Sequence, residues 1–529
     1  MLKITRRILA LIFWLGITFL FLDISGVGKE WFGWMAKMQF LPNVMQLDIV
    51  MIVVLLLLTL FIGRIYCSVI CPAGVLQDFF AWIAGWKIFK RNKKAKFHNR
   101  YHYSKPKTWL RLAVLLIFII MIVAGFNAAV IILAPYSAYG RMVTALLQPL
   151  FINANNMMAA WSEAKENYMF SVVEPNTLPS ILTWVAAISA FALFVLSVYG
   201  GRTYCNTICP VGTVLGYVAK FSWLKMKVNE DNCIKCGLCE RNCKAACIKV
   251  EKGKPVAIDY TRCVVCGNCQ QVCSKSALHL APASNNKAAQ PQHTETPENK
   301  GDMSRRSFLT LTAGLLSTAA LHGQDKTTDG GLAVIEGKKI PERLTPLTPP
   351  GSLSARNMQQ HCTACQLCIA KCPNNVLRPS QSLDSFLQPE MQYDKGYCRP
   401  ECTTCSELCP AGAIRPITVE EKTAVQIGHA VFVKENCVVF TDGVSCGNCA
   451  HHCPSGAIQM VPDGEGYTLN AENGRWYDAD GNMVDTRRIS MIPSVNTEKC
   501  IGCGACEYLC PSRPFSAIYV EGHEVHREI

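Results

Sequence analysis

The chain has 529 residues, of which 29 are cysteine and half are hydrophobic, and its formal net charge is +13. A charged fraction of 17% and a positive mean hydropathy exclude an intrinsically disordered chain and indicate a protein that lies partly in a membrane. So many cysteines in so long a chain argue against a small disulfide-stapled scaffold and favour bound metal. No Cys-x-x-Cys-His sequence occurs, which excludes covalent attachment of c-type haem.

Four apolar segments in the first 200 residues predict membrane-spanning helices: residues 8–24, 48–63, 109–134 and 180–200. A spanning helix needs about 20 apolar residues. A helix buried in a soluble core is the alternative for any single segment, but four of them so close together favour a membrane domain over residues 1–222.

The loop between the second and third segments indicates how this domain is oriented. Residues 87–107 contain nine Lys and Arg residues and no acidic residue. Basic loops between spans stay in the cytoplasm, so both ends of the four-helix unit are expected there, with loops 25–47 and 135–179 outside. We interpret the basic loop as a topology signal and not as a nucleic-acid surface, and expect no nucleic-acid partner.

The second and fourth segments are followed by nearly the same sequence. Gly-Arg-Ile-Tyr-Cys67-Ser-Val-Ile-Cys71-Pro and Gly-Arg-Thr-Tyr-Cys205-Asn-Thr-Ile-Cys209-Pro are offset by 138 residues throughout, which indicates an internal repeat. If each pair lies on a helix, its two cysteines share a face but are too far apart for a disulfide. The four cysteines either converge on a metal or redox-active thiol site, or are small residues that pack helices.

Residues 223–282 are predicted to form a cytoplasmic ferredoxin domain with two [4Fe–4S] clusters. Two Cys-x2-Cys-x2-Cys-x3-Cys runs follow one another, and in this pattern the fourth cysteine of each run binds the other cluster. Zinc is the alternative, but zinc sites use two separated pairs. The predicted ligand sets are Cys233, Cys236, Cys239 and Cys273, and Cys263, Cys266, Cys269 and Cys243. Cys247 is left over and is expected to be a buried thiol.

The C-terminal third repeats the pattern twice, with longer gaps after Cys398 and Cys437, and predicts four more [4Fe–4S] clusters. Exchange of the fourth cysteine gives these ligand sets: Cys362, Cys365, Cys368 and Cys409; Cys398, Cys402, Cys405 and Cys372; Cys437, Cys446, Cys449 and Cys510; and Cys500, Cys503, Cys506 and Cys453. Six clusters in one chain favour the transfer of single electrons over a purely structural role.

A targeting signal is predicted inside the chain. Residues 283–302 are polar and rich in Pro, Gln and Asn, as linkers are. Residues 303–323 begin with Met-Ser-Arg-Arg-Ser-Phe-Leu and continue into a short apolar stretch, which resembles a twin-arginine (Tat) export signal. A fifth transmembrane anchor is the alternative. Because the Tat pathway exports folded proteins, residues 324–529 are expected to be a periplasmic four-cluster domain.

These motifs resemble two partner families. Residues 1–282, with four spans, two Cys-x3-Cys-Pro motifs and a two-cluster ferredoxin, resemble NapH-type membrane ferredoxins. Residues 303–529 resemble the NapG/MauM-type exported ferredoxins. The chain departs from them in the fusion itself and in lacking proline after Cys243 and Cys273. The resemblance implies oxidation of membrane quinol and electron delivery to a periplasmic reductase of the nitrate-reductase kind.

The expected fold is therefore multidomain, an α-helical four-span membrane bundle plus α+β bacterial-type [4Fe–4S] ferredoxin domains in the bacterial inner membrane. The first functional hypothesis is a quinol dehydrogenase that takes electrons from menaquinol in the quinone pool and passes them to a periplasmic reductase or cytochrome. The second is a transmembrane redox relay or sensor that uses Cys67, Cys71, Cys205 and Cys209 to keep a periplasmic metalloenzyme active or to mature it. The third is an assembly scaffold.

Overall fold

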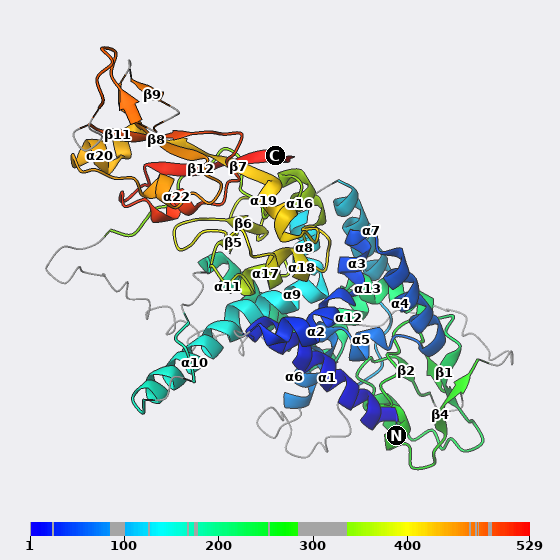
Figure 1. The fold of residues 1–529 in the computed structure, drawn as a ribbon. Coiled ribbons are helices and arrows are strands. Elements are labelled where there is room, and N and C mark those ends of the chain that lie inside the picture. The colour runs from blue at the N-terminus through cyan, green and yellow to red at the C-terminus, as the bar shows by residue number, and fades with distance from the viewer. Residues whose placement is uncertain are drawn as a thin grey trace, which may run out of the picture.

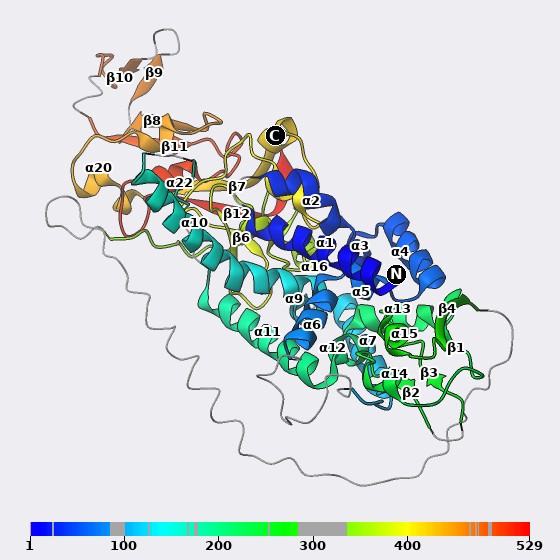
Figure 2. The same ribbon diagram turned by 90° about the horizontal axis from the view of Figure 1, so that it is seen from below.

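The computed structural model describes residues 2–23, 26–84, 101–124, 127–166, 169–173, 178–251, 254–283, 336–464, 467–470, 473, 475–484 and 489–529. Most of the basic loop 87–107, nearly all of the predicted linker and the whole predicted export signal lie outside these residues. A helical part lies between two α+β parts, as Figures 1 and 2 show from two directions.

The predicted spans correspond to helices of unequal length: α1 (Leu2–Leu22), α4 (Ile49–Ile62), α7 (Thr108–Val123) and α11 (Ser180–Gly200). Among the described residues, only α1 and α11 are long and apolar enough to cross a membrane on their own. With 14 residues, α4 is about 21 Å long, whereas a bilayer core is about 30 Å thick. The prediction of one continuous helix over 109–134 is wrong, because α7 ends at Val123 and a separate helix, α8 (Asn127–Leu133), follows.

The internal repeat reappears as two interlocked halves. A very short helix and then a longer one follow each long apolar helix: α5 (Tyr66–Val69) and α6 (Pro72–Ile83) after α4, and α12 (Thr203–Thr207) and α13 (Pro210–Ala219) after α11. Both α6 and α13 start at a proline, whose missing N–H costs nothing at the first helical position. Each packs against the long helix of the other half, α6 on α11 and α13 on α4.

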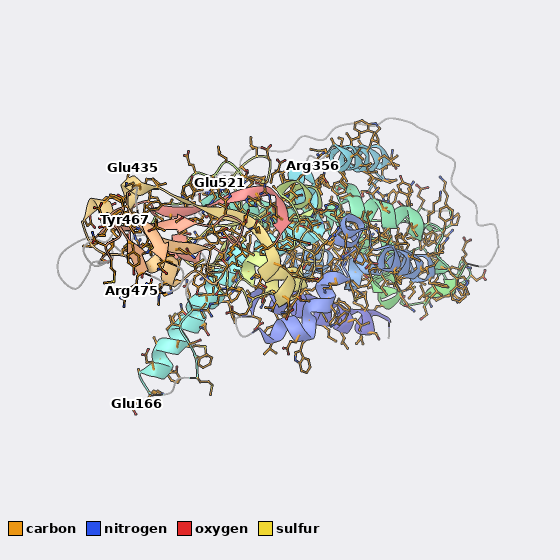
Figure 3. All side chains as sticks on the ribbon, turned by 45° about the horizontal axis from the view of Figure 1, so that its top comes forward. Glu166, Arg356, Glu435, Tyr467, Arg475 and Glu521 are labelled. Atoms are coloured by element: carbon orange, nitrogen blue, oxygen red, sulfur yellow. The ribbon has the colours of Figure 1, made fainter. Side chains whose placement is uncertain are left out.

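The two predicted outer loops are largely helical. Residues 25–47 contain α2 (Val27–Lys37) and α3 (Phe40–Gln46). Residues 135–179 contain α9 (Pro135–Met142), a π-helical turn η2 (Val143–Leu147) and α10 (Gln148–Glu163). The end of α10 projects from the body of the molecule, with Glu166 near its tip (Figure 3). Trp31, Trp34 and Trp161 in these segments are largely exposed.

Residues 224–282 form the first α+β part, here called the first ferredoxin unit. Its outer strands, β1 (Leu224–Val228) and β4 (Leu278–Pro282), pair antiparallel and close the unit. Between them lie α14 (Leu238–Arg241), β2 (Ile248–Lys249), β3 (Ala257–Ile258) and α15 (Asn268–Val272). Its small core consists largely of cysteines together with Met226, Ile248 and Leu278, so bound cofactors would replace much of an ordinary apolar core.

Residues 336–529 form the second α+β part, here called the C-terminal part. Its strands pair antiparallel: β5 (Leu377–Pro379) with β6 (Pro389–Met391), β7 (Val425–Phe432) with β12 (Ile518–Glu528), β8 (Ile458–Pro462) with β11 (Met491–Val495), and β9 (Thr468–Asn470) with β10 (Arg475–Tyr477). The connecting helices are short: α16 (Ala355–His361), α17 (Leu367–Ala370), α18 (Thr404–Leu408), α19 (Val419–Ala424), η3 (Lys434–Asn436), α20 (Val438–Thr441), α21 (Asn448–His451) and α22 (Ala505–Leu509). Glu435, Tyr467 and Arg475 lie at one end of this part, and Arg356 lies toward its other end (Figure 3).

The helical part shares one apolar core with both α+β parts. Cys365, Leu367 and Leu408 of the C-terminal part and Val264 of the first ferredoxin unit belong to the same buried cluster as the bundle residues. The two cysteine-rich parts are therefore packed onto opposite ends of the helices (Figure 2).

A partly buried histidine near the C-terminus, His526, predicts acid sensitivity of the C-terminal part. The Nε2 atom of His526 lies 3.0 Å from Oγ1 of Thr348, and burial, with a contribution from nearby His523, lowers the pKa of His526 from 6.5 to about 4. The folded state therefore binds fewer protons than the unfolded state, so its contribution is complete above pH 6.5 and is lost as pH falls toward 4. We expect a loss of up to about 3 kcal/mol over this window, and a shallower dependence in His526→Gln, measured as the midpoint of thermal unfolding against pH.

Candidate iron–sulfur sites and the junction cavity

Four of the six cysteine runs share one loop conformation. The residues on either side of the second cysteine both have positive φ, between 47° and 80°: Lys235 and Gly237, Val265 and Gly267, Ala364 and Gln366, and Gly502 and Gly504. Such left-handed residues turn backbone N–H groups toward one side and form a concavity that attracts negative charge. The two runs with extended gaps differ, since Thr403 and Gly447 at the corresponding position have φ of −113° and −148°.

The turn after the fourth cysteine does not depend on the proline that two runs lack. The third residue after Cys243 and Cys273 has φ of 51° and 50°, at Ala246 and Ser276. The corresponding values in three of the four proline-containing runs are 53° at Asn375, 64° at Gly412 and 61° at Gly456. The departure noted in the sequence thus leaves the backbone of this turn unchanged.

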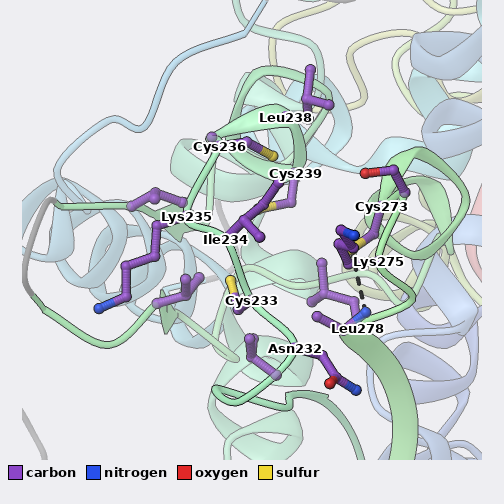
Figure 4. A pocket seen from close by; sticks show the side chains of 16 residues that line it. Asn232, Cys233, Ile234, Lys235, Cys236, Leu238, Cys239, Cys273, Lys275 and Leu278 are labelled. Atoms are coloured by element: carbon purple, nitrogen blue, oxygen red, sulfur yellow. Dashed lines mark hydrogen bonds between the residues drawn. The ribbon is translucent and has the colours of Figure 1, made fainter.

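Four of the predicted ligand sets line four separate cavities, each with three cysteines from one run and the fourth from its partner run. Figure 4 shows the first of them, with Ile234 and Leu278 beside the cysteines. The sets are Cys233, Cys236, Cys239 and Cys273; Cys453, Cys500, Cys503 and Cys506; Cys437, Cys446, Cys449 and Cys510; and Cys372, Cys398, Cys402 and Cys405. Ligation itself stays a prediction, but exchange of the fourth cysteine matches the way these thiols are grouped.

The cysteines of the other two sets are also buried or packed against a core. In the first ferredoxin unit, Cys266 and Cys269 are near enough to Cys243 for their charges to interact. Cys247, the leftover thiol, is buried, and its sulfur lies 3.4 Å from that of Cys243. In the C-terminal part, the remaining set packs around a small core, with Cys362, Cys368 and Cys409 touching it, and Cys365 buried in the core of the helices.

The chemistry of these sites suits clusters better than single ions. Burial raises the pKa of Cys239 and Cys449 to about 11 and that of Cys503 to about 12, so these thiolates need bound iron to compensate their charge. Within the described ranges, no group of three or more His, Cys, Asp or Glu side chains has the spacing for one metal ion. A four-iron cube holds its thiolates farther apart than a single ion does, so the donor sets fit [4Fe–4S] groups.

The repeated motifs meet through a reciprocal pair of arginines. Arg64 donates from Nη2 to the carbonyl oxygen of Cys205 at 3.1 Å, and Arg202 donates from Nη1 to that of Cys67 at 2.7 Å. Gly212 allows this approach, because a Cβ there would lie 2.2 Å from the oxygen of Cys205 and 2.9 Å from Nη2 of Arg64. The cysteine motif of each repeat half thus accepts a hydrogen bond from the arginine of the other half.

The expectation that each Cys-x3-Cys pair lies on one helical face is wrong. Cys67 is in α5, but Cys71 has an extended backbone (φ −73°, ψ 114°) and precedes α6. Cys205 and Cys209 are arranged in the same way around the start of α13. The proline after each second cysteine starts a new helix there, so the chain turns inside each motif.

Asp78 joins three segments that are distant in the sequence. Its carboxylate pairs with Arg202 at 3.0 Å, Arg6 at 3.2 Å and Lys244 at 3.5 Å. Arg6 belongs to the first helix, Arg202 to the second repeat and Lys244 to the first ferredoxin unit, and the side chains of both arginines are buried. One carboxylate therefore neutralises a basic cluster where these parts meet.

Arg141 is a fully buried cation without a hydrogen-bond partner among the described residues, since none of its three guanidinium nitrogens has one. It lies in α9, near enough to Cys365 and Tyr204 for electrostatic interaction. A buried charge needs a counter-charge. An anionic cluster on the set that contains Cys365 would supply it.

This arrangement predicts a change of redox potential. Replacing Arg141 by methionine removes a positive charge beside the site of Cys365, which should lower the reduction potential of that centre by on the order of 50–100 mV. Arg141→Lys, which keeps the charge, should shift it much less. A redox titration followed by electron paramagnetic resonance (EPR) measures both; equal potentials in wild type and Arg141→Met would show that the guanidinium is not the counter-charge.

A large cavity lies where the helices meet the C-terminal part, and is called here the junction cavity. It has a volume of about 860 Å³ and is lined by the end of α1, by α2, by α10 and by the loops around residues 370–375 and 395–399. Asp23 and Lys371 form a buried ion pair of 2.9 Å on its wall. Asp23, at the end of the first predicted span, is buried against the C-terminal part.

Cys372 lines both the junction cavity and the cavity of the Cys372–Cys398–Cys402–Cys405 set. Across the junction, Gln148 donates to the carbonyl oxygen of Ala370 at 3.3 Å, and Lys29 pairs with Glu407. The junction cavity therefore lies beside contacts between the two parts and touches one candidate cluster site.

Sequence reasoning located the cysteines but missed the charged residues around them. Arg64 and Arg202 are part of the repeated motif, so the repeat itself could have indicated that these arginines matter. Asp78, Arg141 and Lys371 carry no motif, and only the folded chain shows what they contact.

The comparisons with known proteins agree with an iron–sulfur chain. A family model described as a 4Fe-4S binding domain matches residues 47–96 and 182–229, and one described as a 4Fe-4S dicluster domain matches residues 443–513. The ferredoxin-type protein NapG of Escherichia coli K12 is 29% identical over 169 residues, 31% of this chain and 65% of NapG. The putative electron transport protein YccM of the same organism is 26% identical over 212 residues, 40% of this chain and half of YccM.

No solved structure matches the chain significantly.

The methylamine utilization ferredoxin-type protein MauM of Methylophilus methylotrophus is 30% identical over 189 residues, 34% of this chain and 72% of MauM. This chain therefore belongs to the MauM/NapG group of ferredoxin-type proteins and carries 4Fe–4S electron-transfer domains.

Proposed function

We propose that this chain is a membrane-bound quinol dehydrogenase that delivers electrons through its C-terminal part to a periplasmic reductase or cytochrome. One observation carries the proposal: the junction cavity lies between the bundle helices and the C-terminal part, and Cys372 connects it to a candidate cluster site. The electron donor and the first acceptor would thus be neighbours.

The cavity has the features that a quinol needs. Part of its wall is apolar and is formed by Val27, Ile152 and Val172. Asp23 and Gln148 add polar groups. Oxidation of a quinol releases protons as well as electrons, and the Asp23 carboxylate is placed to accept one. Lys371, paired with that carboxylate, would hold it in position.

Two cysteine loops of the C-terminal part contact each other directly. The backbone N–H of Cys398 donates to the carbonyl oxygen of Cys503 at 3.0 Å, and Tyr393 between them donates to the oxygen of Gly502 at 2.7 Å. When bound, each [4Fe–4S] cluster takes up one electron. Several clusters in a row therefore suit a quinol, which gives up its two electrons one at a time. The external acceptor would dock at the distal end, beyond β8 and β11.

The membrane topology belongs to the same proposal. We place the helices of residues 1–222 in the bacterial inner membrane as a NapH-like unit with four spans, the first ferredoxin unit in the cytoplasm, and residues 324–529 in the periplasm after export through residues 303–323. The packing of the two α+β parts at opposite ends of the helices supports this placement (Figure 1).

Photolabelling tests where the quinol binds. An azido-menaquinone should attach to peptides from the segments around residues 23–30, 148–173 or 370–399, and excess menaquinone should compete with the labelling. Labelling confined to other helices would contradict the proposed site. Loss of menaquinol oxidation in proportion to labelling would connect the site to the activity.

A second candidate function, a transmembrane redox relay or sensor, is favoured by a different observation. Cys67, Cys71, Cys205 and Cys209 belong to the apolar core that also holds Cys365 on one side and contacts Cys266 on the other. Electrons from the cytoplasm would then keep a periplasmic metalloenzyme active. Reduction of the C-terminal clusters by a cytoplasmic donor without quinol would favour this candidate.

A further inference from the structure

The four cysteines of the internal repeat are buried together where the two halves interlock. Cys67, Cys71, Cys205 and Cys209 are each at most 4% exposed. Cys209 is near enough to all three others for their charges to interact, and Cys71 is near enough to Cys67 and Cys205. Two unrelated pairs of packing residues would have no reason to converge on each other.

The groups around these thiols are donors and cations. Gln77 donates from Nε2 to the sulfur of Cys205 at 3.1 Å, and the N–H of Gly212 donates to the sulfur of Cys209 at 3.3 Å. Nη2 of Arg64 lies 3.8 Å from the sulfur of Cys67. Neutral buried thiols do not need such a shell, whereas thiolates do.

Two buried arginine nitrogens in this shell remain without a hydrogen-bond partner in the part of the chain that the structure describes. They are Nε of Arg64 and Nη2 of Arg202. Both guanidinium groups are fully buried, and Arg202 is within electrostatic reach of Cys67 and Cys205. Four thiolates carry more negative charge than an iron–sulfur core carries positive charge, so a cluster here would be an anion facing these two cations.

We propose that Cys67, Cys71, Cys205 and Cys209 together bind one iron–sulfur cluster at the interface of the two repeat halves. The family model of a 4Fe-4S binding domain matches each half separately, but each match contains only two cysteines, so neither half holds four ligands alone. The cluster is [4Fe–4S] or [2Fe–2S], since both take four thiolates. It goes beyond the six predicted from the ferredoxin-like runs.

Iron content in three full-length variants tests whether the site is shared. The pair Cys67→Ala with Cys71→Ala, the pair Cys205→Ala with Cys209→Ala, and the quadruple variant should each lose the same amount of iron, roughly four atoms for [4Fe–4S] or two for [2Fe–2S]. Equal, non-additive losses support one shared cluster. Additive losses from the two pairs would mean two separate sites, and unchanged iron would mean none; either result overturns the proposal.

A measurement on the unmodified chain covers the case in which the variants fail to fold. Wild-type protein reconstituted anaerobically should contain more than the roughly 24 iron atoms that six [4Fe–4S] clusters require, with matching acid-labile sulfide. Mössbauer spectra distinguish the two cluster types. An iron content of 24 overturns the proposal without bearing on quinol oxidation, which depends on the junction cavity.

Discussion

Replacing Asp23 by asparagine is expected to slow menaquinol oxidation about 100-fold, because the substitution removes a proton acceptor from the wall of the junction cavity while keeping the shape of the side chain. Asp23 accepts from the backbone N–H of Gly28 at 2.9 Å and pairs with Lys371 at 2.9 Å. The loss should fall mainly on kcat, since an amide still occupies the site. The measurement is steady-state menaquinol oxidation per cluster-loaded protein.

A second ion pair provides the matched control. Lys434 and Asp463 are joined at a similar distance, 2.8 Å, but on the exposed surface of the C-terminal part. Asp463→Asn should leave menaquinol oxidation unchanged. If Asp23→Asn keeps its iron and its full rate, the Asp23 carboxylate is not the proton acceptor.

Asp78→Asn is expected to cause the largest loss of stability, about 3–5 kcal/mol, because it leaves buried cations without their counter-charge. Arg6, Arg202 and Lys244 all pair with this carboxylate. The first helix, the second repeat and the first ferredoxin unit should therefore separate at lower temperature. Thermal unfolding of the purified protein, followed by the loss of cluster absorbance, measures the shift.

The same surface variant calibrates this experiment. Asp463→Asn breaks an exposed pair and should cost less than about 1 kcal/mol. A shift for Asp78→Asn no larger than that of Asp463→Asn would show that Asp78 does not hold the three segments together.

Cysteine spacing predicts the grouping of the candidate ligands from the sequence alone, because the ligands of a cluster loop are local in sequence. Three cysteines at intervals of three need one turn of loop, and residues such as Gly237 and Gly504 supply its left-handed conformation. The exchange of the fourth cysteine follows from the antiparallel pairing of strands such as β1 and β4, which brings the two runs of a unit together. The loop conformation and the strand pairing are properties of short segments, and the grouping of thiols around four cavities agrees with both.

The sequence could not predict how these segments meet. Hydropathy indicated a single helix over 109–134 and loops over 25–47 and 135–179, since it does not show where apolar helices end or where polar segments become helical against a second domain. The buried roles of Asp78, Arg141 and Lys371 arise from contacts between residues that are distant in the chain. The packing of α6 on α11 and of α13 on α4, each against the other repeat half, likewise depends on the fold of the whole bundle.

Rapid mixing of the oxidised, cluster-loaded protein with excess menaquinol under anaerobic conditions tests the central claim most directly. Quinol oxidation at the junction cavity predicts prompt bleaching of cluster absorbance near 400 nm and the appearance of EPR signals of reduced clusters, and both should be strongly slowed in Asp23→Asn. Clusters that stay oxidised in the wild-type protein under excess menaquinol would contradict the proposal.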